Sequence, residues 1–242
     1  MRRLSSACKD WGFFQVVNHG VDVELMRNIR EIWREFFDLP LDSKQDLVGE
    51  YGKEVSKLGG KLMKIFSSNL GLQEDGLQDA FGGEEFGGCL RVNFYPKCPQ
   101  PDLTLGLSSH SDPGGMTILL PDENVAGLQV RKAGNWVTVK PVPSAFIINI
   151  GDQIQVLSNA IYKSVEHRVI VNSAKDRVSL AFFYNPRGDL LIGPSKELVK
   201  PDQPALYPSM TFNEYRLFIR TKGPCGKAQV ESIKSSSISS RN

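Results

Sequence analysis

Three histidines and one neighbouring carboxylate are the residues of this chain best suited to metal chemistry. His110 and Asp112 lie two positions apart, in surroundings typical of a strand. On an extended segment such residues point to the same face, so both side chains can reach one metal ion. Taken alone, however, the pair is better interpreted as an exposed polar turn.

His167 changes this interpretation. It lies 55 residues beyond Asp112 (112 to 167), in the strand-like run 164–170, where the alternative is a buried histidine bonded to the backbone. Two histidines and one carboxylate form a facial triad that leaves three coordination positions open, an arrangement associated with non-haem Fe(II). Zinc is a poorer fit, because a zinc site would not explain three open coordination positions. We therefore predict that His110, Asp112 and His167 bind Fe(II), and that the third histidine, His19, is structural.

A second group of residues is suited to a carboxylate ligand. Arg177 and Ser179 begin a later strand-like run, ten residues beyond the last histidine. They share one face of a strand, and a guanidinium fork matches the geometry of a carboxylate. Arg91, Asn93 and Tyr95 alternate in the same way along an earlier run, so all three can point into one interior.

The elements that must position these residues divide the chain into a helical first third and a strand-rich remainder. Apolar spacing predicts helices over 22–37, 51–70 and 211–220, the last opened by a capping box. Gly59 and Gly60 within the second helix require either close packing or a bend. Short apolar runs separated by turn residues predict eight strands: 90–95, 116–120, 128–131, 136–140, 145–150, 154–157, 165–171 and 178–184.

This pattern predicts a mainly β fold with flanking helices, in which a double-stranded β-helix, a cupin-like jelly roll, forms the core. We expect an N-terminal helical region over 1–84 and the jelly-roll core with its C-terminal helix over 85–222. The serine-rich tail, 223–242, is predicted to be disordered.

Composition narrows the classes of partner. The charge of +2, from 29 basic and 27 acidic residues, does not favour nucleic acid. No apolar run approaches the length of a membrane span. Four widely spaced cysteines without a CxxC pair indicate reduced thiols. We expect a monomer in the cytoplasm, with the nucleus as an alternative.

Together, these motifs resemble those of the plant 2-oxoglutarate/Fe(II)-dependent dioxygenases. The likeness spans nearly the whole chain and includes five further segments: 11–20 (WGFFQVVNHG), 93–96 (NFYP), 127–129 (GLQ), 149–152 (NIGD) and 158–159 (SN). The resemblance implies that Arg177 and Ser179 hold the distal carboxylate of 2-oxoglutarate, assisted by Tyr95 and Asn93. It also implies O2 as oxidant, ascorbate as an accessory reductant, and release of succinate and carbon dioxide.

Within that family the chain is most similar to the jasmonate-induced oxygenases, which hydroxylate jasmonic acid to 12-hydroxyjasmonic acid. Four segments carry this likeness: 105–108, 113–117, 162–166 and 215–221. Arg216 and Arg220 stand four apart on the last predicted helix and so share a face. With Arg91 they could clamp a small carboxylated substrate; alternatively, they are surface arginines that pair with acids.

The chain departs from this family at two places. Related chains have a longer segment before the position of Met1. Relatives also carry a few dozen residues, with strands of the substrate pocket, where this chain passes from Leu47 to Tyr51. The alternatives are therefore a flavonoid-type oxidase and a shortened, non-catalytic metal-binding remnant. A zinc-containing, cupin-like storage protein fits least, because Arg177 and Ser179 would have no task.

Overall fold

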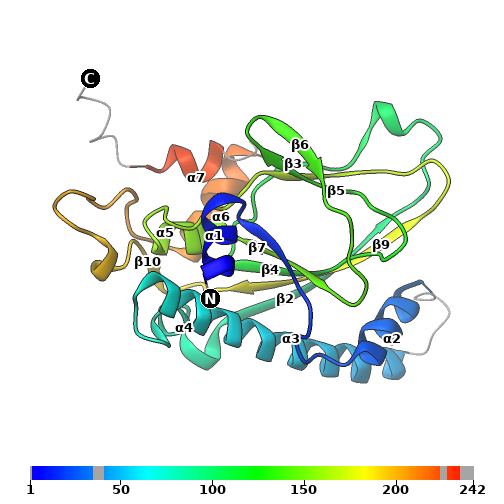
Figure 1. Ribbon diagram of the computed structural model, residues 1–242, viewed down its shortest axis with the longest axis horizontal. Coiled ribbons are helices and arrows are strands. Elements are labelled where there is room, and N and C mark those ends of the chain that lie inside the picture. Colours follow the sequence, from blue (N-terminus) through cyan, green and yellow to red (C-terminus); the bar gives the residue numbers. More distant parts are fainter. Residues whose placement is uncertain (1, 35–40, 224–227, 235–242) are drawn as a thin grey trace.

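The structure is a computed structural model that describes residues 2–34, 41–223 and 228–234. Two antiparallel sheets face each other, which confirms the predicted jelly-roll core (Figure 1). The larger sheet has the strand order β1-β7-β4-β9-β2. Its strands are β1 (Phe13–Val16), β7 (Phe146–Ile150), β4 (Met116–Leu120), β9 (Arg177–Asn185) and β2 (Gly87–Tyr95).

The smaller sheet has the strand order β3-β8-β5-β6. Its strands are β3 (Leu105–His110), β8 (His167–Ile170), β5 (Leu128–Lys132) and β6 (Asn135–Thr138). A separate two-stranded ribbon joins β10 (Leu191–Ile192) to β11 (Met210–Thr211).

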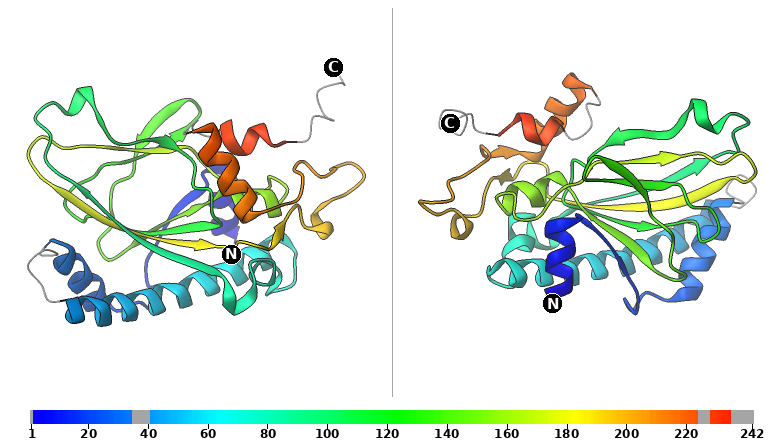
Figure 2. Two further views of the ribbon diagram at one scale, coloured as in Figure 1. Left: turned by 180° about the vertical axis from the view of Figure 1, so that it is seen from behind. Right: turned by 45° about the horizontal axis from the view of Figure 1, so that its top comes forward.

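Helices cover the outer face of the larger sheet and one end of the two sheets. The long helix α3 runs along the larger sheet, with α2 beside it (Figure 1). The C-terminal helices α6 and α7, orange to red, lie together beside one end of the sheets (Figure 2). The helices are α1 (Arg2–Asp10), α2 (Val23–Arg34), α3 (Leu41–Leu70), α4 (Gly76–Ala80), α5 (Asp152–Leu157), α6 (Phe212–Lys222) and α7 (Ala228–Ser232), with 3-10 turns η1 (Gly83–Glu85), η2 (Pro101–Leu103) and η3 (Lys196–Leu198).

Side chains along β4 point alternately to the two faces of the larger sheet. Ile118 and Leu120 belong to the main core, which the sheet shares with α2 and α3. Leu119, between them, points to the opposite face and packs in a smaller cluster with Leu128 of β5. Burying each of these side chains contributes about 1.5–3 kcal/mol. One face of the sheet thus packs against the helices, and the other faces the interior between the two sheets.

The paired glycines of α3 mark a close approach and not a bend. A Cβ atom on Gly59 would lie 2.5 Å from the ring of Tyr184 in β9. The helix continues through Gly59 and Gly60 from Leu41 to Leu70, and so also across the 47–51 junction. Only a residue without a side chain lets the helix come this close to the sheet.

Three expectations need correction. The run 154–157 is not a strand but lies in α5, where burial on every side removes the periodic pattern that distinguishes a helix. The strands β1 and β3 were not predicted, and β1 brings the N-terminal region into the larger sheet by pairing with β7. Part of the tail is helical, since α7 buries Val230 fully. The predicted helix stop at Leu39-Pro40 lies outside the described residues. Among the described helices, none is long and apolar enough to cross a membrane.

Candidate active site

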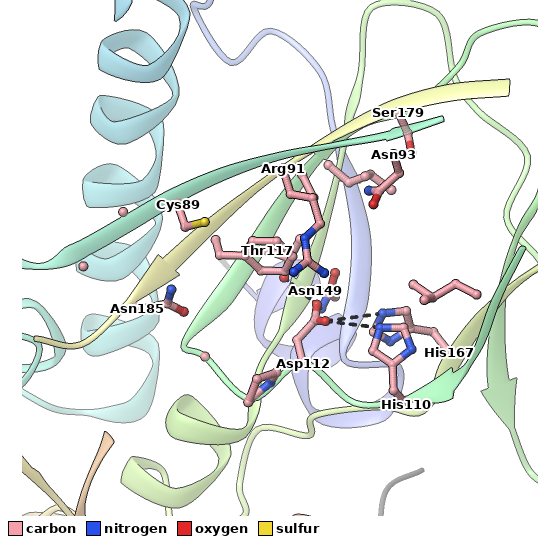
Figure 3. A pocket seen from close by; sticks show the side chains of 18 of the residues that line it. Cys89, Arg91, Asn93, His110, Asp112, Thr117, Asn149, His167, Ser179 and Asn185 are labelled. Carbon is pink, nitrogen blue, oxygen red and sulfur yellow. Dashed lines mark hydrogen bonds and ion pairs between the residues drawn. The ribbon is translucent and has the colours of Figure 1, made fainter. Parts of the chain in front are cut away.

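The two predicted histidine ligands are direct neighbours across two strands. His110 ends β3 and pairs in register with His167, the first residue of β8. Asp112 lies two residues beyond β3, and its Oδ1 is 3.6 Å from the Nε2 of each histidine. Ligand atoms of the three residues all lie within 4.8 Å of one another, and Figure 3 shows them converging on one point. The structure therefore brings the predicted triad together.

The backbone turns each imidazole toward this point. Nδ1 of His110 lies 2.8 Å from the carbonyl oxygen of Ser108, and Nδ1 of His167 lies 3.1 Å from that of Val165. A carbonyl accepts a hydrogen bond, so the proton of each neutral ring belongs on Nδ1. The Nε2 lone pairs are then free to bind a metal, and the backbone contacts hold both rings in the required orientation.

Thr117 and Asn149, to which the sequence assigned no role in the site, hold the carboxylate. Oδ2 of Asp112 accepts hydrogen bonds from the hydroxyl of Thr117 and from the amide of Asn149, the latter at 2.8 Å. Thr117 and Asn149 are register partners on β4 and β7. Each is a polar residue inside an otherwise apolar strand, and that was the available signal. Since Oδ2 is engaged, Oδ1 is the atom left for a metal.

The protonation states also suit metal binding. Burial disfavours the charge of Asp112, but His167, His110 and the Thr117 hydroxyl together outweigh it and hold the pKa of this carboxyl well below its usual range. Burial lowers the pKa of His167, so this imidazole is neutral at pH 7. Burial also opposes the charge of His110, but Asp112 outweighs it and raises the pKa of His110. At lower pH His110 is therefore protonated, and a metal ion must displace this proton in order to bind.

This donor set fits Fe(II). Two imidazole nitrogens and one carboxylate oxygen form the facial arrangement that leaves positions open for other ligands. The open side faces a cavity of about 740 Å³ that extends between the sheets. Nine of the ten residues selected from the sequence line it: Arg91, Asn93, Tyr95, His110, Asp112, His167, Arg177, Ser179 and Arg216.

The residues predicted to hold 2-oxoglutarate form one wall of this cavity. On the paired strands β2 and β9, Tyr95 lies opposite Arg177 and Asn93 lies opposite Ser179. The guanidinium carbon of Arg177 is 5.1 Å from the centre of the Tyr95 ring, and Nη1 donates to the Ser179 hydroxyl at 3.3 Å. A Cβ atom on Gly127 would lie 3.0 Å from Cδ of Arg177, so the glycine leaves room for this side chain.

Arg177 carries an unused hydrogen-bond donor. The residue is 4% exposed, and its Nε has no partner among the described residues. Burial lowers the pKa of the guanidinium, but an arginine remains charged at physiological pH. Asp122 attracts this charge, but burying a charge stays costly unless it is also hydrogen-bonded, and a carboxylate ligand would reduce that cost through charge-assisted hydrogen bonds. This end of the cavity therefore fits a dicarboxylate such as 2-oxoglutarate.

The three arginines considered for the substrate are placed differently. Arg91 on β2 and Arg216 on α6 line the cavity, and Figure 3 shows Arg91 directed toward the triad. Their guanidinium carbons lie 5.9 Å from the Phe183 ring and 5.7 Å from the Phe212 ring. All three arginines are exposed, but Arg220, one helical turn farther along α6, is not among the described residues that line the cavity.

His19, Cys8 and Cys98 are not among the described residues that line this cavity, whereas Cys89 on β2 is. Nε2 of His19 lies 2.9 Å from the carbonyl oxygen of Ser144, and Nδ1 accepts from the backbone of Val21 at 3.1 Å. These contacts agree with a structural role. Among the described residues, Cys8, Cys89 and Cys98 are free thiols, whereas Cys225 lies outside the described part of the chain.

A jelly roll that gathers two histidines and a carboxylate beside a buried arginine defines a non-haem iron oxygenase site. Residues 86–186 match the 2OG-Fe(II) oxygenase superfamily, and residues 1–74 match the family described as non-haem dioxygenase in morphine synthesis N-terminal. This chain belongs to the 2OG-Fe(II) oxygenase superfamily. It is a dioxygenase that uses Fe(II) and the co-substrate 2-oxoglutarate.

Two relatives and one crystal structure show which members of this superfamily the chain resembles. Jasmonate-induced oxygenase 2 of Arabidopsis thaliana is 54% identical over 96% of this chain and 77% of its own length. Flavanone 3-dioxygenase 2 of Oryza sativa subsp. japonica is 37% identical over 88% of this chain and 77% of its own length. A crystal structure of JOX2 in complex with 2OG, Fe and JA has a TM-score of 0.93 and 54% identity, covering 97% of this chain and 85% of that one.

The alignment with jasmonate-induced oxygenase 2 contains a large gap. It extends over 285 residues, but 96% of this 242-residue chain is only about 232, so about 50 aligned positions lack a counterpart here. This length agrees with the few dozen extra residues expected in relatives; the place expected for them, 47–51, lies within α3, which runs without a break.

Proposed function

We propose that this enzyme hydroxylates jasmonic acid to 12-hydroxyjasmonic acid. The observation that carries the proposal is a single cavity that joins the predicted iron ligands, the buried Arg177 and two further arginines. The 54% identity to jasmonate-induced oxygenase 2 supports the same substrate. We further propose that the enzyme acts as a monomer in the cytoplasm, in plant specialised metabolism. The absence of cysteine pairs in the sequence favours that compartment.

Each part of the cavity would have a separate task. His110, Asp112 and His167 would bind Fe(II), while Thr117 and Asn149 orient the carboxylate ligand. Arg177 and Ser179 would bind the distal carboxylate of 2-oxoglutarate, with Tyr95 and Asn93 beside them. When bound, Fe(II) and 2-oxoglutarate supply the oxygen activation that couples decarboxylation to substrate hydroxylation.

The remaining surface would orient the substrate. Arg91 and Arg216 would bind the carboxylate of jasmonic acid, and Arg220 could approach from the next turn of α6. The apolar body would pack against the apolar part of the lining, which includes Leu107, Leu119, Leu128, Val169 and Phe183. Such a wall excludes water and holds the reacting carbon beside the metal.

The arginines predict a strong preference for a free acid. Jasmonic acid should bind the anaerobic Fe(II)–2-oxoglutarate enzyme about thirtyfold more tightly than its methyl ester or an amide conjugate, because Arg91 and Arg216 are both exposed and each ion pair with the carboxylate contributes at most about 1 kcal/mol. Calorimetric titration of both ligands measures the difference. In Arg91→Leu the preference for the acid over the ester should be smaller.

Equal binding of acid and ester by the unaltered enzyme would show that the arginines do not bind the substrate carboxylate. It would favour the flavonoid-type alternative, in which aromatic and hydroxyl groups replace the charge contact. The same titration with Arg220→Leu decides whether the third arginine takes part, since a loss of acid preference requires contact with the carboxylate.

The gap in the alignment predicts that 2-oxoglutarate consumption is poorly coupled to hydroxylation of the substrate. The strand order of the larger sheet ends at β2, which also borders the cavity, and Phe94 on this strand is 60% exposed. A missing wall would leave the substrate loosely held, and misplacement by about 1 Å can cost on the order of a hundredfold in rate. We expect Fe(II) and 2-oxoglutarate to bind normally, and succinate to form well in excess of hydroxylated jasmonic acid.

Quantifying succinate and 12-hydroxyjasmonic acid in the same reaction tests this expectation. A ratio near one from a monomeric preparation would show that other residues rebuild the wall. No succinate at all, with iron bound, would instead favour the metal-binding remnant. We also expect lower solubility than that of a full-length relative, because an uncovered sheet edge promotes association.

A further inference from the structure

A fully buried carboxylate without a task in the proposed reaction, Asp152, contacts the loop 111–115 that carries Asp112, here called the metal-binding loop. Asp152 is the first residue of α5, and its backbone N–H donates to the carbonyl oxygen of Asp112 at 2.8 Å. Two further backbone contacts tie this turn to the loop, from Gly151 to Gly115 at 2.7 Å and from Gln153 to Gly114 at 2.9 Å. The start of α5 therefore holds the loop that carries Asp112.

The side chain of Asp152 joins this loop to a different part of the fold. Oδ2 accepts a hydrogen bond from the hydroxyl of Tyr215 at 2.7 Å and another from Ser111 at 3.3 Å. Ser111 stands between His110 and Asp112 in the sequence, whereas Tyr215 lies on α6. One carboxylate oxygen thus bridges the metal-binding loop and the C-terminal helix.

Tyr215 can hold α6 at a fixed position relative to the metal-binding loop. Its side chain is fully buried, and burial together with the adjacent Asp152 raises its pKa, so the hydroxyl stays protonated and donates. Arg216 is the next residue on the same helix and lines the cavity. A displacement of α6 at Tyr215 would therefore displace Arg216 relative to the metal ligands.

We propose that Asp152 and Tyr215 are positioning residues, whose hydrogen bond sets the distance between Arg216 and the metal-binding loop and thereby part of the affinity for the substrate carboxylate. The substrate part of this inference rests on the proposed function; the geometric part does not. Neither residue is among the described residues that line the cavity, so any effect on binding must pass through α6 or through the loop that carries Asp112.

The test compares Tyr215→Phe with Tyr207→Phe. Both changes remove one buried phenol hydroxyl, since Tyr207 is 2% exposed and its hydroxyl accepts from Gln155 at 2.8 Å. Tyr207 lies outside α6, and its hydrogen bond does not reach the metal-binding loop. A merely structural role would give the two variants similar losses of thermal stability and similar ligand binding.

Binding to the anaerobic Fe(II)–2-oxoglutarate enzyme gives the first measurement. In Tyr215→Phe, the Kd for jasmonic acid should rise about fivefold, since displacing the exposed Arg216 weakens its ion pair with the substrate carboxylate. The Kd for methyl jasmonate, which does not use the charge of Arg216, and that for 2-oxoglutarate should change by less than about twofold. Tyr207→Phe should leave all three within about twofold. Equal effects of the two variants on the acid would overturn the inference.

Amide hydrogen exchange gives a second measurement that needs no substrate. Amides of 212–222 should exchange faster in Tyr215→Phe than in Tyr207→Phe, because α6 loses its tie to the loop. Unchanged exchange over these residues would overturn the inference. If the unaltered enzyme bound neither jasmonic acid nor its ester, the proposed substrate would be wrong, while the exchange comparison would still decide whether Tyr215 positions α6.

Discussion

Replacing His167 by alanine should abolish stoichiometric Fe(II) binding in a protein that remains folded. The imidazole supplies one of three converging ligand atoms, each within 4.8 Å of the others. Loss of even a residue that only supports a ligand lowers metal affinity about 10- to 100-fold, so loss of the ligand itself should exceed that range. Anaerobic equilibrium dialysis against Fe(II), with circular dichroism to verify the fold, measures the effect.

His19→Ala is the matched control for this change. His19 also bonds the backbone through its ring, but it lies at a turn and outside the cavity. This variant should lose some stability and still bind one Fe(II) per chain. Undiminished iron affinity in folded His167→Ala would show that the triad is not the metal site.

Replacing Arg177 by leucine should raise the Kd for 2-oxoglutarate on the order of a hundredfold or more while Fe(II) stays bound. The guanidinium is buried, lies over Tyr95 and keeps its Nε free of partners among the described residues. Truncating one side of a buried charge pair costs about 2–5 kcal/mol. Titration of 2-oxoglutarate into the anaerobic Fe(II) enzyme gives the Kd directly.

Arg168→Leu provides the comparison for this second variant. Arg168 donates to Gln129 at 2.8 Å and stacks on Trp136, so it is also a strand arginine with fixed contacts, but it does not line the cavity. Its removal should leave the Kd for 2-oxoglutarate within about twofold. The proposed pairing would be wrong if Arg177→Leu bound the co-substrate as tightly as Arg168→Leu does.

Features that depend on local spacing could be predicted from the sequence. His110 and Asp112 were expected to share a face because alternate residues of an extended segment do so, and both belong to the triad although Asp112 lies two residues beyond β3. Alternation also placed Arg91, Asn93 and Tyr95 on one side of β2, and all three line the cavity. The capping box of Thr211 and Glu214 that opens α6 is present as predicted. Each signal lies within a few residues and needs no distant partner.

Elements whose signal is not local were missed or misassigned. The α5 helix is buried on every side, so its apolar residues lack the amphipathic period of a surface helix. The β3 strand has register shifts against β8 between Leu105, Leu107 and His110, which interrupt strict alternation. Exposed Leu105 and Leu107 also make this strand look unlike a buried one.

By itself, the sequence determined which side chains could bind a metal and a carboxylate, because residue type and short spacing decide that chemistry. Only the tertiary structure decided that His110 lies opposite His167, 57 residues later in the chain, since strand register depends on the packing of whole sheets. The same holds for Thr117 and Asn149 behind Asp112, and for the bond between Asp152 and Tyr215. These contacts join strands and helices distant in sequence, and they form only when the two sheets and α6 have assembled.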